Sequence, residues 1–167
     1  MKKISFALAV LLVFFVNNSF AQATAEKATT GKVTAPKFDP AKNPFEDLKS
    51  AIVEAQKSNK RILLDVGGEW CIWCHRLDSF LEQNSDLKNF MHSKFIVLKV
   101  NYSPENKNEK FLTQFPKIPG YPHIFVLEKD GKLLHSQDTG LLEKEKSYDA
   151  DKIMNFFKEW APQKGKS

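Results

Sequence analysis

The chain has only two cysteines and seven glycines among its 167 residues. Two cysteines cannot build a framework of several disulfides, which excludes the class of small domains that disulfide bonds hold together. No internal repeat is visible. Basic residues alternate with acidic ones, as in Glu143-Lys144-Glu145-Lys146, and no stacking aromatic residues accompany them. The sequence therefore predicts a solvated charged surface, with no nucleic-acid partner.

A hydrophobic run long enough to cross a membrane is also missing. Two lysines precede an apolar run of thirteen residues from Ile4 to Val16, shorter than the roughly 20 that span a bilayer. This pattern predicts a secretory signal peptide at residues 1–21, with cleavage after Ala21 or alternatively after Ala23. No cysteine follows the run to carry a lipid anchor. We expect an exported protein, periplasmic or otherwise secreted, with no stable membrane insertion after cleavage.

The rest of the chain has the length of one domain. Residues 22–43, rich in Ala, Thr, Lys and Pro, are expected to be a flexible linker, residues 44–161 a domain, and residues 162–167 a disordered tail. Apolar periodicity predicts helices at 44–58, 71–83, 86–92, 109–115 and 149–160, and strands at 61–66, 95–100, 123–127 and 132–135. Alternating strands and helices, followed by a hairpin at Asp130-Gly131, predict a three-layer α/β/α sandwich with a mixed central sheet.

Both cysteines lie in one short motif, Trp70-Cys71-Ile72-Trp73-Cys74-His75, where a strand gives way to a helix. The Cys-x-x-Cys spacing is typical of a dithiol redox site. Backbone N–H groups at a helix N-terminus stabilise a thiolate, and comparable motifs lower the pKa of the first cysteine from about 8.5 to roughly 3.5–7. The sequence therefore predicts Cys71 as an accessible nucleophile and Cys74 as the resolving thiol, the two forming a redox-active disulfide.

Three other interpretations of this motif stay open. A purely structural disulfide is disfavoured, because closing so short a loop removes little entropy from the unfolded chain. Cys71-Ile72-Trp73-Cys74-His75 also matches the motif for covalent haem attachment, with His75 as axial ligand. Two thiolates and a histidine could also bind zinc, but a closed site would need a fourth ligand, which no further cysteine and no close histidine pair supplies. A metal- or haem-binding carrier thus remains the alternative to a redox enzyme that needs no cofactor.

Asp65 interrupts the apolar run Arg61–Val66. Burying a lone carboxylate costs free energy, so the group either finds a partner or has its pKa raised until it carries a proton. Near Cys74, such a group would help the resolving thiol to ionise. Asp65 is therefore a candidate catalytic residue.

The segment from Ile62 to Cys74 resembles the active site of the thioredoxin superfamily, including the spacing from the buried aspartate to the first cysteine. Gly120-Tyr121-Pro122, just before an apolar strand, resembles the cis-proline loop of that family, and Pro122 fits its order better than Pro119. The resemblance implies that Tyr121 and Pro122 shape the substrate site. It also implies that Gly140 lies on the rim of the substrate groove.

The motif departs from that of cytosolic thioredoxins, because Ile72 and Trp73 replace their Gly-Pro and His75 replaces a Lys or Arg. It is similar to that of secreted thioredoxin-like proteins with Trp-Cys-x-Trp-Cys followed by His or Lys. Trp70 and Trp73 are candidate platforms for extended protein substrates. The resemblance implies a monomeric protein thiol-disulfide oxidoreductase, a reductase rather than an oxidase, that receives electrons from a membrane thiol-disulfide relay.

Overall fold

The computed structural model describes residues 37–163. The expected signal peptide lies outside the described residues, as do residues 22–36 of the expected linker and residues 164–167 of the expected tail. Within the described part of the chain, no helix has both the length and the apolar character that crossing a membrane requires.

A mixed sheet of four strands forms the centre of the domain. The strands are β1 (Arg61–Gly67), β2 (Phe95–Asn101), β3 (His123–Leu127) and β4 (Leu133–Asp138), arranged in the order β2-β1-β3-β4. Strand β1 pairs in parallel with β2 and antiparallel with β3, which in turn pairs antiparallel with β4. The mixed sheet is as predicted, and the strand that leads to the cysteines is a central one.

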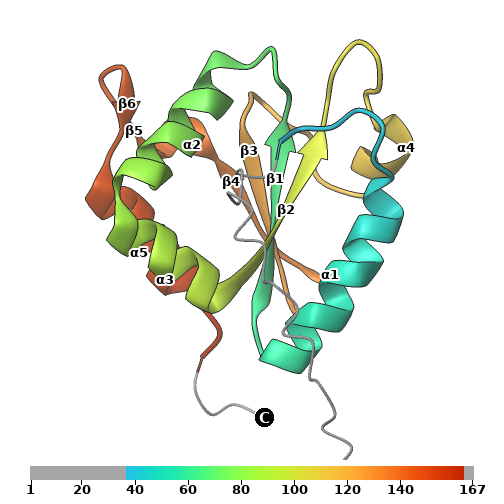
Figure 1. The fold of residues 1–167 in the computed structure, drawn as a ribbon, viewed down its shortest axis with the longest axis horizontal. Helices are drawn as coiled ribbons and strands as arrows, with labels where there is room; N and C mark the ends of the chain where they lie inside the picture. Colours follow the sequence, from blue (N-terminus) through green and yellow to red (C-terminus); the bar gives the residue numbers. More distant parts are fainter. Residues whose placement is uncertain (1–36, 164–167) are drawn as a thin grey trace, which may run out of the picture. The chain divides into compact units, whose positions relative to one another are not determined.

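Helices cover both faces of the sheet (Figure 1). On one face lie α2 (Ile72–Gln83), α3 (Ser85–Lys94) and α5 (Ala150–Trp160), and on the other α1 (Pro44–Ser58) and α4 (Glu109–Leu112). Successive residues of β1 serve the two cores in turn: Leu63 packs with Phe157 on one face, and Leu64 packs with Phe125 on the other. The predicted three-layer sandwich is confirmed.

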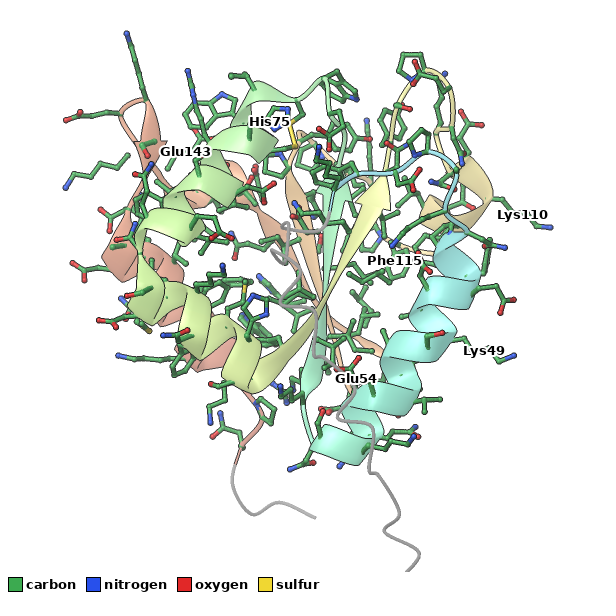
Figure 2. All side chains as sticks on the ribbon, viewed as in Figure 1. Lys49, Glu54, His75, Lys110, Phe115 and Glu143 are labelled. Atoms are coloured by element: carbon green, nitrogen blue, oxygen red, sulfur yellow. A yellow bond between two sulfur atoms is a disulfide. The ribbon has the colours of Figure 1, made fainter. Side chains whose placement is uncertain are left out.

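Helix α1 illustrates how local sequence sets these elements. The side chain of Asn43 accepts a hydrogen bond from the Phe45 amide at 3.1 Å, and Pro44 occupies the first turn, where its missing N–H costs nothing. The helix buries Ala51 and Ala55. Lys49 of this helix and Lys110 of α4 point away from the sheet (Figure 2).

The sequence-based boundaries differ from the structure in the second half of the chain. Helix α4 ends at Leu112, before the predicted 115, and β4 continues to Asp138, beyond the predicted 135. After the 3₁₀ turn η1 (Thr139–Leu142), the charged run forms a small hairpin of β5 (Glu143–Lys144) and β6 (Ser147–Tyr148), which the sequence analysis missed. Alternating apolar and polar residues could not predict this hairpin, because Tyr148 is the one buried residue in its two short strands.

The segment before α1 is part of the domain, which corrects the expected linker boundary at residue 43. Phe38 is only 2% exposed, and the side chain of Asn106 donates a hydrogen bond to the Pro40 carbonyl oxygen at 2.8 Å. We call residues 37–43 the N-terminal arm. The packed domain therefore begins no later than residue 38.

Candidate active site

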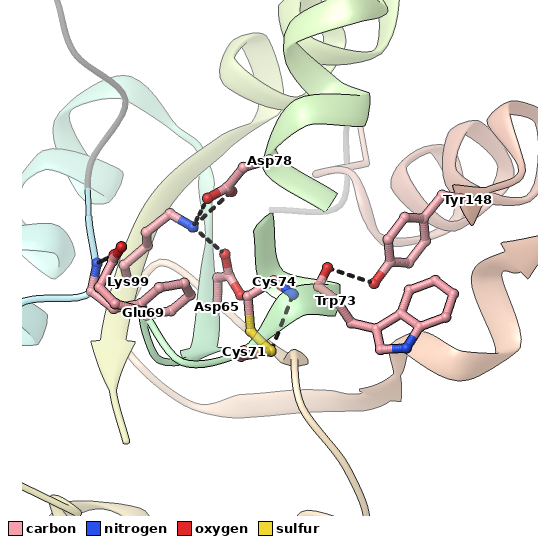
Figure 3. A network of polar contacts seen from close by, with 9 residues as sticks. Asp65, Glu69, Cys71, Trp73, Cys74, Asp78, Lys99 and Tyr148 are labelled. Atoms are coloured by element: carbon pink, nitrogen blue, oxygen red, sulfur yellow. Dashed lines mark hydrogen bonds and ion pairs between the residues drawn. A yellow bond between two sulfur atoms is a disulfide. The ribbon is translucent and has the colours of Figure 1, made fainter. Parts of the chain in front are cut away.

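The two cysteines form a disulfide at the N-terminus of α2. Cys71 is the N-cap residue, and its sulfur accepts a hydrogen bond from the Cys74 amide at 3.1 Å (Figure 3). An amide directed at this sulfur favours the thiolate once the disulfide opens, as the helix terminus also does. The structure thus brings the predicted nucleophile and resolving thiol together at the predicted place.

The disulfide is more enclosed than the sequence analysis expected. Cys71 is 3% exposed and Cys74 is 1% exposed, whereas the flanking Trp70 and Ile72 are 55% and 60% exposed. Phe38 shares a buried cluster with the two cysteines, and Trp73 and Tyr121 pack against that cluster. A substrate therefore meets an apolar rim before it reaches the first sulfur.

Asp65 has a buried ion partner, Lys99 of the neighbouring strand. The two residues are paired in the register of β1 and β2, and their side chains meet at 2.9 Å. The Lys99 ammonium also contacts both carboxylate oxygens of Asp78, at 2.7 and 3.0 Å (Figure 3). Asp65 Oδ2 is paired in this way, but its buried Oδ1 has no hydrogen-bond partner among the protein atoms. Of the two expected outcomes for Asp65, the structure shows the partner.

The strand geometry places Asp65 on the side of β1 that faces the disulfide. A β-carbon built on Gly67 would lie 2.5 Å from the sulfur of Cys74, so this face of the strand points at the resolving cysteine. Residues two apart in a strand share a face, which puts Asp65 on the same side. The absence of a side chain at Gly67 is what allows this close approach.

Burial and charge act against each other in the ion network. Burial opposes the charged form of Lys99, but the carboxylates of Asp65 and Asp78 outweigh it and raise the pKa of the ammonium. For Asp78 burial is the larger influence and raises the pKa of the carboxyl above its usual 3.8, despite the attraction of Lys99. Lys99 therefore stays charged at neutral pH.

A small apolar cavity reaches this network from the side of α2 and α3. It has a volume of about 60 Å³, and Asp65, Asp78 and Lys99 contribute to its lining together with Leu77 and His92. This volume exceeds the roughly 15 Å³ that one water molecule needs. The network is thus not sealed on every side.

The loop before β3 has a cis peptide bond between Tyr121 and Pro122, as expected from the resemblance. Pro122 is buried, and its carbonyl oxygen accepts a hydrogen bond from the hydroxyl of Thr139. Tyr121 packs against the cysteine pair, and burial raises the pKa of its phenol to about 12. The loop therefore lies against the disulfide with a neutral tyrosine at physiological pH.

An aromatic group joins this loop to the motif. The Trp70 indole packs edge-on against Tyr121 at 5.7 Å and donates a hydrogen bond to the Tyr102 carbonyl oxygen at 2.6 Å, while the Tyr102 and Tyr121 rings stack at 4.7 Å. A side chain at Gly68 would lie within 2.6 Å of that carbonyl, so glycine is needed for this contact. Tyr102 follows β2 directly and was missed by the sequence analysis.

The other two candidate substrate residues have different surroundings. Trp73 lies on α2 and packs edge-on against Tyr148 at 5.8 Å, with the Arg76 guanidinium 4.4 Å from its ring. Gly140 is exposed in η1, and its amide donates a hydrogen bond to Asp138. Its neighbour Thr139 contacts Pro122, which places η1 beside the cis-proline loop.

His75 lies on α2 near the disulfide (Figure 2). Its Nε2 contacts the Glu69 carbonyl oxygen at 2.7 Å, and since a carbonyl can only accept, this nitrogen is the donor. A protonated nitrogen directed at the backbone does not present a lone pair to iron. Within residues 37–163, no group of three or more His, Cys, Asp or Glu side chains has the arrangement of a metal site.

Comparisons with known proteins agree with this geometry. The family model described as a thioredoxin-like domain matches residues 48–154. A curated relative, the disulfide bond reductase DsbH of Chlamydia pneumoniae, is 27% identical over 99 residues; the match covers 54% of this chain and 59% of that protein. The chain thus spans about three fifths of the length of this relative.

Solved structures show the same fold. The disulphide isomerase of Xylella fastidiosa superposes with a TM-score of 0.64 at 23% identity, over 76% of this chain and 97% of that one. The oxidised C-terminal domain of DsbD from Neisseria meningitidis superposes with a TM-score of 0.51 at 20% identity, over 75% and 99% of the two chains.

Proposed function

Because the chain belongs to the thioredoxin-like domain family, we propose that it is a thiol-disulfide oxidoreductase that exchanges disulfides with protein substrates. The observation that carries this proposal is the Cys71–Cys74 disulfide at the N-terminus of α2, packed against Tyr121 of the cis-proline loop. The name of the curated relative, a disulfide bond reductase, supports the same chemistry.

In the reductive direction the reaction begins with the dithiol form. The Cys71 thiolate attacks one sulfur of a substrate disulfide, a mixed disulfide forms, and the other substrate sulfur leaves as a thiolate that takes up a proton. Cys74 then loses its proton and attacks the Cys71 sulfur. The second substrate thiol departs, the enzyme disulfide forms, and two electrons have passed from the dithiol to the substrate.

Asp65 is the proposed acceptor of the Cys74 proton. It lies on the strand face that points at this cysteine, and its Oδ1 is not occupied by Lys99. Lys99 holds the other oxygen and keeps the carboxylate in place without occupying both oxygens. Proton transfer to a positioned carboxylate raises the fraction of attacking thiolate.

The exposed residues of the rim are the proposed contact surface for substrate. Trp70 offers an exposed apolar ring, Tyr121 offers its backbone to an extended segment, the buried Pro122 fixes that backbone through the cis bond, and Gly140 lies in the turn beside them. Trp73, held against Tyr148, has the supporting role of fixing α2.

We further propose that the protein acts outside the cytoplasm as a reductase and that a membrane thiol-disulfide relay supplies its electrons. The basis is the signal-peptide pattern at residues 1–21, together with the reductase named above. Equilibrating the Cys71/Cys74 couple with glutathione measures its reduction potential, which gives the direction of electron flow. A potential below that of the surrounding thiol pool supports a reductase, and one above it supports an oxidase or isomerase.

The decisive experiment uses Cys74→Ser in the full chain. Without the resolving thiol, Cys71 should remain joined to partners as mixed disulfides that reducing agent releases, whereas a matched Cys71→Ser variant should trap none. Wild-type protein should reduce insulin in the presence of dithiothreitol. Absence of both trapping and insulin reduction, or a Soret absorbance in the purified protein, would contradict the proposed activity.

A further inference from the structure

The N-terminal arm places an aromatic ring against the inner side of the disulfide. Phe38 is 2% exposed and belongs to the same buried cluster as Cys71 and Cys74. The point that a β-carbon on Gly67 would occupy lies 2.5 Å from the Cys74 sulfur and 3.0 Å from Cζ of Phe38. The ring and the resolving sulfur therefore border the same narrow space beside Gly67.

The same ring covers the ion network. The Lys99 ammonium lies 4.1 Å from the centre of the Phe38 ring, in the geometry of a cation-π contact. Lys99 is in turn 2.9 Å from Asp65. One side chain thus contacts both the dithiol and the cation that holds the proposed proton acceptor.

The arm is fixed at two points. The backbone amide of Phe38 donates a hydrogen bond to a carboxylate oxygen of Glu69 at 3.0 Å, and the Pro40 carbonyl oxygen accepts one from Asn106 at 2.8 Å. Glu69 lies two residues before Cys71, so the first bond ties the arm directly to the motif. Residues 37–43 also lie outside the segment that the family model matches.

We propose that Phe38 is a positioning residue for the exchange reaction: its ring keeps bulk water away from Cys74 and from the side of Lys99 that the arm covers, so that Cys74 exchanges its proton with Asp65 and not with solvent. This inference rests on the proposed oxidoreductase function. It assigns the arm a part in the site, although the arm precedes the matched domain.

Several ionisable groups surround the space that the ring closes, from every element packed against it. They are Asp65 on β1, Lys99 on β2, His75 and Asp78 on α2, Glu69 in the motif loop and Tyr121 in the cis-proline loop. Replacing Phe38 leaves all of these groups in the protein and removes the cation-π contact of Lys99. Because Asp65 and Asp78 still pair with Lys99, a change in Cys74 chemistry on replacement would report altered access of water.

The test measures alkylation of Cys74 by iodoacetamide as a function of pH, in the full chain with Cys71→Ser so that Cys74 is the sole thiol. Burial raises the pKa of a thiol, so Phe38→Ala should lower the Cys74 pKa and speed alkylation near neutrality. A decrease of one pKa unit corresponds to about tenfold more thiolate. Phe38→Leu keeps an apolar cover over Cys74. Its Cys74 pKa and alkylation rate should lie between those of the protein with Phe38 and those of Phe38→Ala.

Phe45→Ala is the matched control, because Phe45 is an exposed phenylalanine in the first turn of α1 that contacts Phe111. It should leave the alkylation profile unchanged. Glu69→Gln loosens the arm without removing the ring, and should speed alkylation by a factor of roughly two to three, the size of one weakened hydrogen bond. If Phe38→Ala does not fold, the alkylation rate of Glu69→Gln tests the role of Phe38 instead.

Unchanged Cys74 pKa and alkylation rate in folded Phe38→Ala, or in Glu69→Gln if the former does not fold, would overturn the role of Phe38. Insulin reduction by wild-type protein would still stand in that case. Failure of insulin reduction and of partner trapping, with a large effect of Phe38→Ala on alkylation, would overturn the oxidoreductase function instead. The two failures are thus distinguishable.

Discussion

The inner side of the Cys71–Cys74 disulfide faces Phe38 and the buried Lys99 network, whereas its outer side is flanked by Trp70 and Ile72, each more than half exposed. On the inner side Asp65 and Lys99 are buried and depend on each other, so removing one of them leaves the other uncompensated. On the outer side water replaces a lost contact. We therefore propose that the inner side governs stability and proton transfer and that the outer side governs encounter with partners.

The largest effect is expected on the inner side, for Lys99→Met. This change leaves the carboxylates of Asp65 and Asp78 without their shared cation, and loss of one partner of a buried ion pair typically costs about 3–5 kcal/mol. Urea unfolding measures it. The control is Lys88→Met, which breaks a partly exposed pair with Glu82 and should cost less than about 1 kcal/mol. If the two variants lost the same free energy of unfolding, the inner side would not contribute more to stability than an exposed ion pair does.

The difference in the free energy of unfolding between wild type and Lys99→Met should also depend on pH. Because the pKa of Lys99 is raised in the folded protein above the ordinary 10.5, its stabilisation is complete below the pKa of the unfolded chain. It is lost as the pH rises through the folded value. The free energy of unfolding should therefore differ by a constant amount from neutral pH up to about 10 and converge at higher pH.

The next largest effect is expected for Asp65→Asn, which keeps the shape but removes the proton acceptor. Resolution of the mixed disulfide by Cys74 should slow by roughly a hundredfold, the lower end of what general base catalysis contributes. Rapid-quench measurement of mixed-disulfide decay tests this. Asp78→Asn is the control, because it takes a carboxylate from the same Lys99 and leaves Asp65 in place. If Asp78→Asn slowed resolution of the mixed disulfide as much as Asp65→Asn does, Asp65 would not be the specific proton acceptor.

What the sequence could predict here is local. The cysteine spacing, the Asn43-Pro44 helix start and the apolar run of β1 are each encoded within a few residues, so the sandwich, the helix that carries the motif and the position of Asp65 follow from the pattern. The cis-proline loop follows from the resemblance.

The missed residues depend on contacts between distant segments. Lys99 faces Asp65 across 34 positions through the strand register, and no local rule distinguishes it from a surface lysine at the end of a strand. Phe38 lies in a stretch whose composition predicts a linker, and its tertiary contacts with Lys99, the cysteines and Glu69 are with residues far along the chain. An unpaired aspartate in a buried strand was the one available signal that a cation had to be near.

The smallest effect is expected on the outer side, for Trp70→Ala. The indole packs on Tyr121 and is largely exposed, so its loss removes apolar contact area from the rim while the disulfide stays covered by Phe38. The value of kcat/KM for insulin should fall by about tenfold, which corresponds to roughly 1.4 kcal/mol of contact with an extended substrate. Reduction of glutathione disulfide, which is too small to cover the rim, should change by less than about twofold, and the free energy of unfolding by less than about 1 kcal/mol. If kcat/KM fell equally for insulin and for glutathione disulfide, Trp70 would be acting through the cysteines. The distinction between an outer side for recognition and an inner side for chemistry would then fail.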